Sequence, residues 1–145
     1  FIQNAGTGTV IDLPDGDSPK TQGYTKRSLG DPLVPTQLWV VTGDEPIYTI
    51  ENTSSRTFMD LAGGDATIGT PIIGYKQTGQ ANQQWRIIPN TKTTAYITGP
   101  YVASSQQVDM YVSSNKANGT PVNGWTGIGA TTTNDHQLWK FVVPA

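Results

Sequence analysis

Four side chains in the middle of the chain have the chemistry needed to bind neighbouring hydroxyl groups. They are Asp60, Tyr75, Asn82 and Gln83. A carboxylate can accept two hydroxyl protons in charge-assisted hydrogen bonds, amides can bond to the same oxygens, and an exposed aromatic ring can stack on the apolar face of a pyranose. Gly63 follows the aspartate and leaves room for such a ring to approach the backbone. Together these residues could bind a ligand with neighbouring hydroxyl groups; the alternative is that Asp60 caps a turn and Tyr75 packs half-buried.

An internal repeat supplies the elements that must position these side chains. The motif Gln-x-Trp occurs three times, at 37–39, 83–85 and 137–139. Upstream of each copy an aspartate lies within an apolar strand, and these aspartates, 48 and 49 residues apart, are Asp12, Asp60 and Asp109. A self-similar period of this length is typical of a fold built from repeated units. We therefore expect one domain over 1–145, made of repeats at about 1–45, 46–93 and 94–145.

The composition predicts that each repeat is made of strands. The β-branched residues Thr, Ile and Val number 42 whereas Leu, Met and Glu number 10, and 16 Gly with 10 Pro divide the chain into short segments. The middle repeat contains candidate strands at 47–51, 57–61, 71–75 and 84–88. One such unit cannot bury its apolar face alone, so the three units should close into a barrel with pseudo-threefold symmetry. A propeller is the alternative, but propellers have about four to eight blades.

The Gln-x-Trp motif is interpreted as a feature of the fold. Residues alternate between the two faces of a strand, and in the last repeat this alternation directs Trp139, Phe141 and Val143 inward. We therefore expect Trp39, Trp85 and Trp139 in the core. The Gln two positions earlier can bond backbone groups of a turn that would otherwise lack partners.

These three phased motifs resemble those of the ricin B-type (R-type) β-trefoil lectins, especially the cysteine-free single-domain members from fungi. The resemblance covers the whole chain and implies an all-β fold, a β-trefoil of three four-stranded repeats. In members that bind galactose or N-acetylgalactosamine, the site consists of an Asp, an aromatic about 15 residues later and an Asn before the Gln, which Asp60, Tyr75 and Asn82 match here. With Gly63 and Gln83, these residues form the best candidate site.

The third repeat matches this pattern in part. Asp109 and Trp125 are present, but His136 precedes Gln137 where the family has Asn. A His can donate to or accept from a hydroxyl, yet it can equally pack over a turn. We regard these four residues as a possible second site.

The first repeat departs furthest from the pattern. Asp12 and Tyr24 remain, but they are only twelve residues apart, and Thr36 stands before the Gln in place of Asn. We expect any sugar site in this repeat to be weak or inactive.

Charge and composition exclude several classes of function. The formal net charge is −2 and the nine Lys and Arg residues are scattered, so we expect no nucleic-acid partner. No apolar run reaches the roughly 20 residues that span a bilayer, so we expect no membrane insertion. The absence of Cys favours a cytoplasmic or non-classically secreted protein. The sequence begins at Phe1, inside an expected strand and without a Met, so targeting cannot be judged from it.

No catalytic or metal-binding arrangement is evident in the sequence. His136 is the only His, Cys is absent, and no Gly-x-Ser-x-Gly motif occurs. The aspartates recur by repeat and do not form the paired carboxylates of a glycosidase. We therefore expect a protein that is not an enzyme, needs no cofactor or metal, and has glycans as its partners.

Other functions remain open at this point. The altered first repeat also fits a lectin-like partner subunit with decayed sugar sites, similar to the light subunit that accompanies a mushroom tyrosinase, in which an apolar patch would dock on a larger enzyme. The segment 31–35 is the candidate loop of a third possibility, a β-trefoil protease inhibitor. A homodimer is also compatible with the sequence, because a shallow site binds a monosaccharide weakly and several linked sites raise the avidity.

Overall fold

The computed structural model describes residues 1–15, 19–102 and 108–144, which form twelve antiparallel β-strands and four short 3-10 helices. The strands are β1 (Ile2–Asn4), β2 (Val10–Asp12), β3 (Gln22–Tyr24), β4 (Trp39–Asp44), β5 (Ile47–Asn52), β6 (Phe58–Leu61), β7 (Ile72–Tyr75), β8 (Trp85–Pro89), β9 (Tyr96–Pro100), β10 (Val108–Val112), β11 (Thr120–Thr126) and β12 (Trp139–Phe141). The 3-10 helices are η1 (Val34–Gln37), η2 (Ala62–Gly64), η3 (Ala81–Gln83) and η4 (Asp135–Gln137). Within the described ranges, no helix has the length and apolarity needed to cross a membrane.

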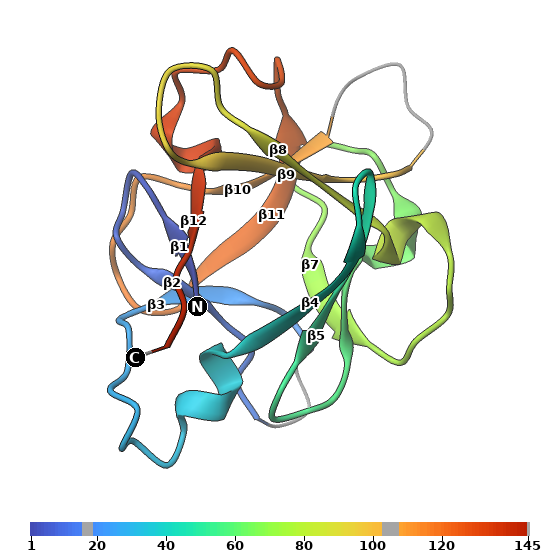
Figure 1. Cartoon of the computed structure of the whole chain (residues 1–145). Coiled ribbons are helices and arrows are strands. Elements are labelled where there is room, and N and C mark those ends of the chain that lie inside the picture. Colours follow the sequence, from blue (N-terminus) through green and yellow to red (C-terminus); the bar gives the residue numbers. More distant parts are fainter. Residues whose placement is uncertain (16–18, 103–107, 145) are drawn as a thin grey trace.

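The strands are arranged with pseudo-threefold symmetry (Figure 1). Three antiparallel pairs, β12–β1, β4–β5 and β8–β9, form the barrel and are linked by the pairings β5–β8 and β9–β12. The hairpins β2–β3, β6–β7 and β10–β11 are joined to one another through β3–β11 and through the isolated bridges Lys20↔Ile73 and Pro71↔Asn123. This architecture confirms the predicted all-β β-trefoil.

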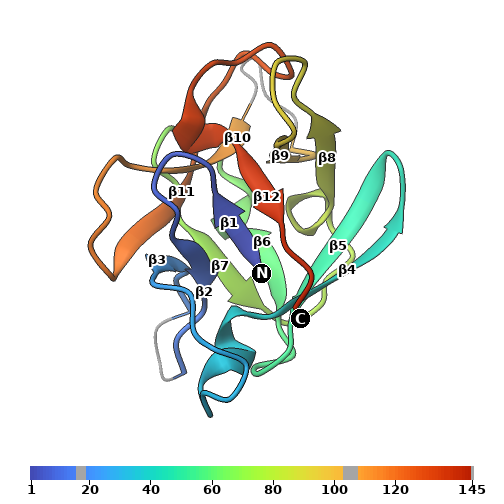
Figure 2. The ribbon, with the colours of Figure 1, turned by 60° about the vertical axis from the view of Figure 1, so that its left-hand side comes forward.

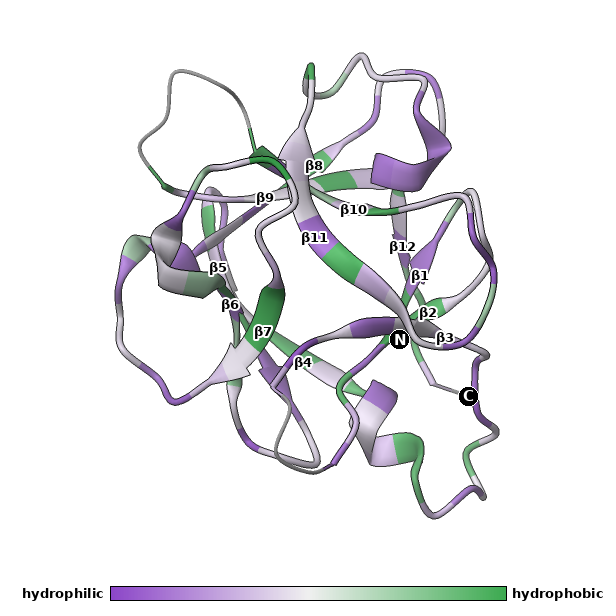
Figure 3. Ribbon diagram, turned by 180° about the vertical axis from the view of Figure 1, so that it is seen from behind, coloured by the Kyte–Doolittle hydropathy of each residue, from purple (hydrophilic) through white to green (hydrophobic). Residues whose placement is uncertain are grey.

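The core is assembled from equivalent strands of all three repeats. In β6, Met59 and Leu61 are fully buried, while Asp60 between them points to the opposite face of the hairpin. Ile11 in β2 and Met110 in β10 take the place of Met59 in the other repeats and belong to the same apolar cluster. Hydrophobic residues accordingly lie in the strands, as along β7, whereas several connecting loops are polar (Figure 3).

Each Gln-x-Trp tryptophan joins the end of its repeat to the second strand of the same repeat. The three indole hydrogen bonds run from Trp39 Nε1 to Ile11 O (3.0 Å), from Trp85 Nε1 to Met59 O (2.9 Å) and from Trp139 Nε1 to Met110 O (2.9 Å). Trp85 and Trp139 are fully buried, as predicted. Trp39 is only partly buried, and it packs against the edge of the core.

The glutamine of the motif bonds the backbone of a turn, as predicted. Gln83 Nε2 donates to Lys76 O (2.8 Å), and its Oε1 accepts from the backbone N–H of Thr78 (2.8 Å). Gln37 and Gln137 likewise donate to backbone carbonyls of the preceding turn in their repeats. All three glutamines are buried, so these bonds satisfy both the side chains and turn groups that water does not reach.

One residue predicted to point into the core is exposed. Val143 follows Trp139 and Phe141 in the inward phase, yet it is 82% exposed. Its counterpart in the middle repeat, Pro89, is exposed as well, although it pairs with Tyr96. Burial therefore ends before this position in both repeats, and the prediction that Val143 points into the core was wrong.

The indole hydrogen bonds should differ in their contribution to stability. We expect Trp85→Phe to lower the free energy of unfolding by about 1–3 kcal/mol, because Met59 O is left buried without a donor. Trp39→Phe removes the same kind of bond at a partly exposed site where water can replace the indole, and we expect roughly 1 kcal/mol or less. Urea unfolding of both variants measures the difference, and an equal or larger loss for Trp39→Phe would contradict the expected role of burial.

Candidate functional site

The middle repeat holds a carboxylate between two carboxamides. Asp60 lies in β6, and both Asn82 and Gln83 come from η3. Asp60 Oδ1 accepts a hydrogen bond from Asn82 Nδ2 (3.0 Å), and Oδ2 accepts one from Gln83 Nε2 (2.9 Å). Asn82 Nδ2 also donates to Leu61 O (3.2 Å). The carboxylate is thereby fixed in orientation, and each of its oxygens retains a lone pair for a further donor.

Tyr75 lies on the same face of the β6–β7 hairpin as Asp60. The register pairs Asp60 with Ile73 and Phe58 with Tyr75, and directly paired residues of antiparallel strands share a face. The position of Tyr75 is therefore diagonal to that of Asp60, at a typical separation of about 7–8 Å. Tyr75 is 46% exposed and Asp60 is 3% exposed. The result is an exposed aromatic ring beside a recessed carboxylate.

Two glycines keep the surface next to this carboxylate free of side chains. Gly63 and Gly64, in η2, have φ values of 63° and 65°, a left-handed conformation that residues with a Cβ rarely adopt. A Cβ at Gly63 would meet nothing within 4 Å, and one at Gly64 would lie 3.7 Å from Asn82 Cβ. The backbone of η2 therefore leaves open space at Gly63, into which a ligand ring can extend.

Burial controls the charge state of the site. Desolvation raises the pKa of Asp60 above its ordinary value of 3.8, and the hydrogen bonds from Gln83 and Asn82 oppose this rise by stabilising the carboxylate. The two amides therefore have a second role besides orientation, because they keep a recessed acid in the form that accepts hydroxyl protons.

The third repeat presents a tyrosine at the position of Asp60. Met110 pairs with Gly124 of β11, as Met59 pairs with Gly74 of β7. The carbonyl oxygen of each methionine accepts the hydrogen bond from the tryptophan indole N–H of its repeat. The residue that follows Met110 is Tyr111, so Tyr111 corresponds to Asp60. Equating Asp109 with Asp60 was therefore wrong by two residues. The error arose because Asp109 and Tyr111 lie in the same phase of an alternating strand, so the pattern of apolar neighbours does not distinguish them.

Asp109 is turned toward the neighbouring repeat. It pairs in register with Trp125, but it is fully buried and its Oδ1 lies 3.7 Å from Arg86 Nη2 of β8. A Cβ at Gly127 would lie 1.8 Å from Asp109 Oδ2, so the chain after β11 covers the carboxylate closely. The structure places Asp109 and Trp125 side by side, with Asp109 buried in an inter-repeat ion pair.

An aromatic cluster occupies the outer face of the third repeat. The Tyr111 and Trp125 ring centroids are 5.0 Å apart with an interplanar angle of 31°, and His136 meets Tyr111 edge-on at 6.4 Å. Trp125 is 37% exposed. His136 Nδ1 is buried and has no hydrogen-bond partner among the described residues, and a Cβ at Gly6 would lie only 2.7 Å from it. In the ranges described, no group of three or more His, Asp or Glu side chains is placed to hold a metal ion.

Sequence reasoning missed Tyr111. The pairs Gly74-Tyr75 and Gly124-Trp125 align without a gap, but the hairpins before them differ in length, so only the register that pairs Gly124 with Met110 identifies Tyr111 as the equivalent of Asp60. The remaining predicted residue of this repeat, Gln137, bonds Thr126 O (2.8 Å) and supports the turn.

The first repeat is closed by its own side chains. Asp12 is buried, and it accepts hydrogen bonds from Gln22 Nε2 (2.8 Å) and from the hydroxyl of Thr36, which takes the place of Asn82. The guanidinium carbon of Arg27 lies 4.8 Å from the centroid of the Tyr24 ring. Asp12 therefore accepts one hydrogen bond at each oxygen, as Asp60 does, and this repeat differs in that a guanidinium already covers its aromatic ring.

The amide bonds to Asp60 can be tested by titration. We expect Asn82→Ala to raise the pKa of Asp60 further, because the substitution removes a hydrogen bond to the charged form. Carbon-13 NMR of the Asp60 carboxyl across acidic pH measures this shift. Gln84→Ala is the matched control, since its amide donates to Gly79 O and not to Asp60, and it should leave the titration unchanged. An Asp60 pKa that falls or stays constant in Asn82→Ala would contradict the assignment.

Comparisons with known proteins place this geometry in a family context. The family model described as ricin-type beta-trefoil lectin domain-like matches residues 35–125. No curated protein sequence matches the chain. Among solved structures, a designed threefold symmetric protein, ThreeFoil, has a TM-score of 0.79 at 18% identity and covers 96% of this chain and 94% of its own.

Two fungal proteins of known structure are also similar. The lectin of Polyporus squamosus, solved with a human-type influenza-binding epitope, has 30% identity and a TM-score of 0.73; the match covers 97% of this chain and 46% of the lectin, so the chain spans about half of its length. The Rhizoctonia solani agglutinin has 25% identity and a TM-score of 0.71, covering 97% of this chain and 91% of its own. Since the family model matches more than half of its residues, this chain belongs to the ricin-type β-trefoil lectin domain-like family.

Proposed function

We propose that the protein is a carbohydrate-binding lectin domain without catalytic activity, and that its main site is in the middle repeat. The observation that carries this proposal is the Asp60 carboxylate, held by Asn82 and Gln83 beside the exposed ring of Tyr75. The ligand class we propose is a terminal galactose, N-acetylgalactosamine or related residue.

Binding would use the free lone pairs of the oriented carboxylate. Two neighbouring hydroxyls of the sugar donate to Asp60 Oδ1 and Oδ2, while the apolar face of the pyranose stacks on Tyr75. Asn82 donates its two Nδ2 protons to Asp60 Oδ1 and Leu61 O, and its Oδ1 can accept a hydrogen bond from a sugar hydroxyl. Gly63 provides the space for the ring.

The site should bind a monosaccharide weakly. A shallow surface with one stacking ring and a few polar contacts is expected to give a Kd of around 1 mM, or about −4 kcal/mol. Useful affinity would then depend on several sites or on association of the protein. The other repeats offer less, because Tyr111 replaces the acid in the third and the Arg27 guanidinium already covers the Tyr24 ring in the first.

The third repeat is the proposed secondary site. Trp125 gives it an exposed stacking surface, and its ring packs against that of Tyr111. Without a carboxylate at the position of Asp60, its ligand contacts would be stacking and single hydrogen bonds from Tyr111. We expect this surface to be weaker and less selective among sugars than the middle repeat.

A lectin-like partner subunit of an enzyme, such as a fungal tyrosinase, is the second candidate function. It is favoured by the closed first repeat and by exposed apolar residues outside the sugar site, among them Ile128, Val40 and Val143. In this case the protein would co-purify from its source with a larger companion, and sugar binding would be lost or altered.

The proposed site predicts the outcome of a glycan array. We expect the protein to bind galactose-type glycans and Asp60→Asn to weaken that binding by roughly 10- to 100-fold, because a hydrogen bond to a charged group contributes about 1.5–3 kcal/mol. Tyr75→Ala should also weaken binding, through loss of the stacking surface. Thermal unfolding of each variant shows whether it is folded, and binding is compared only among folded variants.

Control variants test whether glycan binding comes from the middle repeat. Asp44→Asn removes an exposed aspartate on the barrel side and should leave binding unchanged, and Trp125→Ala should have a small effect. Full binding by folded Asp60→Asn would rule out the middle-repeat site, and silence of the wild type on a broad array would favour the partner-subunit function.

A further inference from the structure

A cross-strand row of side chains places a lysine beside the proposed sugar site. Asp60 of β6 pairs with Ile73 of β7, and Ile73 pairs on its other side with Lys20, which belongs to the first repeat. Residues directly opposite one another in antiparallel pairs project from the same face. Asp60, Ile73 and Lys20 therefore lie side by side, on the face of the β6–β7 hairpin that also carries Tyr75.

Backbone hydrogen bonds fix Lys20 in this register. Gly74 N donates to Pro19 O (2.8 Å), and Thr21 N donates to Ile72 O (3.0 Å). The hydroxyl of Thr21 donates to the same carbonyl (2.7 Å). Figures 1 and 2 show this part of the first repeat, in blue, beside β7. The backbone of Lys20 is thus held next to the site by the sheet, although the side chain is long.

The ammonium group of Lys20 is available to a ligand. Lys20 is exposed, and the ion pairs within the described ranges are all formed by arginines. Tyr75 is two residues beyond Ile73, so Lys20 is diagonal to Tyr75 at a typical separation of about 7–8 Å. A ring stacked on Tyr75 is therefore flanked by the carboxylate of Asp60 on one side and by this ammonium on the other.

The equivalent rows of the other two repeats end in a proline. They are Tyr111, Asn123 and Pro71 in the third repeat, and Asp12, Gln22 and Pro121 in the first.

The middle row differs from these two in both of its outer positions. It has a positive charge at the end where the other rows have a proline, and its central residue, Ile73, has no polar side-chain atom to bond its neighbours. In the first repeat, by contrast, Gln22 donates to Asp12. A free cation therefore accompanies the repeat that combines an oriented carboxylate with an exposed aromatic ring.

The chemistry of the middle row changes from one end to the other. Asp60 accepts hydrogen bonds from hydroxyls and repels an anion, whereas the lysine ammonium only donates and attracts negative charge. Between them, Ile73 and Tyr75 give an apolar surface for a sugar ring. The ligand that matches this order has neighbouring hydroxyls at one edge of its ring and an anionic group at the opposite edge.

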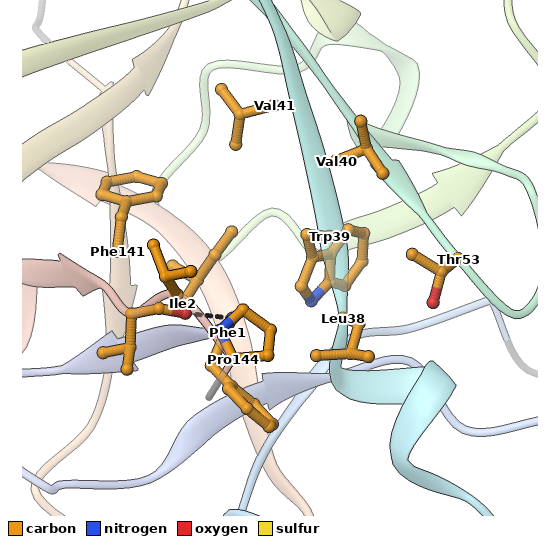
Figure 4. Close-up of a pocket in the computed structure, with 11 residues that line it drawn as sticks. Phe1, Ile2, Leu38, Trp39, Val40, Val41, Thr53, Phe141 and Pro144 are labelled. Atoms are coloured by element: carbon orange, nitrogen blue, oxygen red, sulfur yellow. Dashed lines mark hydrogen bonds between the residues drawn. The ribbon is translucent and has the colours of Figure 1, made fainter. Parts of the chain in front are cut away.

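An apolar cavity elsewhere in the molecule does not match such a ligand. It has a volume of about 370 Å³ and lies between the segments of Phe1 and Trp39 (Figure 4). None of the side chains that line it is charged. A sulfate or carboxylate would find no counter-charge among these side chains, so an anionic sugar is expected at Lys20 and not in the cavity.

We propose that Lys20 forms an anion subsite of the middle-repeat site, and that the preferred ligand is a galactose-type residue with a sulfate or carboxylate opposite the hydroxyls that Asp60 binds. This inference rests on the proposed function, because Asp60 and Tyr75 must hold the ring for the anion to reach Lys20. Carbon 6 of the sugar is a suitable position for the anionic group, since a group there leaves the ring hydroxyls free.

Matched sugars test the subsite. The probes are methyl galactoside, its 6-sulfate, and methyl galacturonoside, which carries a carboxylate at carbon 6. In proton–nitrogen NMR titrations that follow the Gly63 amide, we expect at least one anionic probe to bind about three- to tenfold more tightly than the neutral one, through an accessible charge pair. This gain should shrink as salt is added, because exposed charges are screened. Using both anions distinguishes a sulfate site from a carboxylate site.

Variants of the protein assign the preference to one lysine. Lys20→Gln should bring the Kd values of the neutral and anionic probes to within a factor of about two, and Lys20→Glu should make the anionic probes the weaker ligands. Lys140→Gln removes the same charge from an exposed position of β12 and should keep the preference. Lys76→Gln removes a charge next to Tyr75 in the sequence and should also keep it. Thermal unfolding shows whether each variant is folded.

The neutral galactoside separates this inference from the proposed function. If no probe binds, both are overturned, whereas binding of the galactoside with no gain for either anion overturns the anion subsite alone. A gain that persists in folded Lys20→Gln, or that is lost in Lys76→Gln instead, also overturns it. So does binding of the 6-sulfate that survives undiminished in Asp60→Asn, because Lys20 would then attract an anion without a sugar held at Asp60.

Discussion

The indole N–H of each Gln-x-Trp tryptophan donates to a backbone carbonyl in the second strand of its own repeat, and the rest of the structure depends on this bond. It fixes the last strand of the repeat against the hairpin of the second and third strands, and it satisfies the one polar atom of a large ring. The same bond defines which residues of the three repeats correspond. The face of the second strand opposite the indole acceptor then carries Asp12, Asp60 or Tyr111.

The candidate sugar site in the middle repeat uses groups that the fold already requires. Gln83 is buried because it supports a turn, and its Nε2 also reaches Asp60. Asn82 adds a second donor, so the carboxylate stays oriented although burial raises its pKa. In the first repeat Thr36 and Gln22 occupy the Asp12 carboxylate instead, and in the third the acid is absent. One fold thus carries three chemically different surfaces.

Much of the fold could be predicted because it rests on local, repeated signals. The Gln-x-Trp spacing, the β-branched composition and the turn residues indicated the β-trefoil, and the strands of the middle repeat agree with prediction within about two residues. The position of Asp109 could not be settled by alternation, since Asp109 and Tyr111 share one phase and only the pairing of Met110 with Gly124 distinguishes them. The difference in burial between Trp39 and the other two tryptophans depends on packing between segments that are distant in the sequence, which no local pattern reports.

The measurement that bears most directly on the lectin site is a crystal structure of the protein soaked with N-acetylgalactosamine. Ring density stacked on Tyr75, with two neighbouring hydroxyls within hydrogen-bond distance of the Asp60 oxygens, is the predicted result. Sugar density at the third repeat, with the surface between Asp60 and Tyr75 left to solvent, would contradict the assignment of the middle repeat.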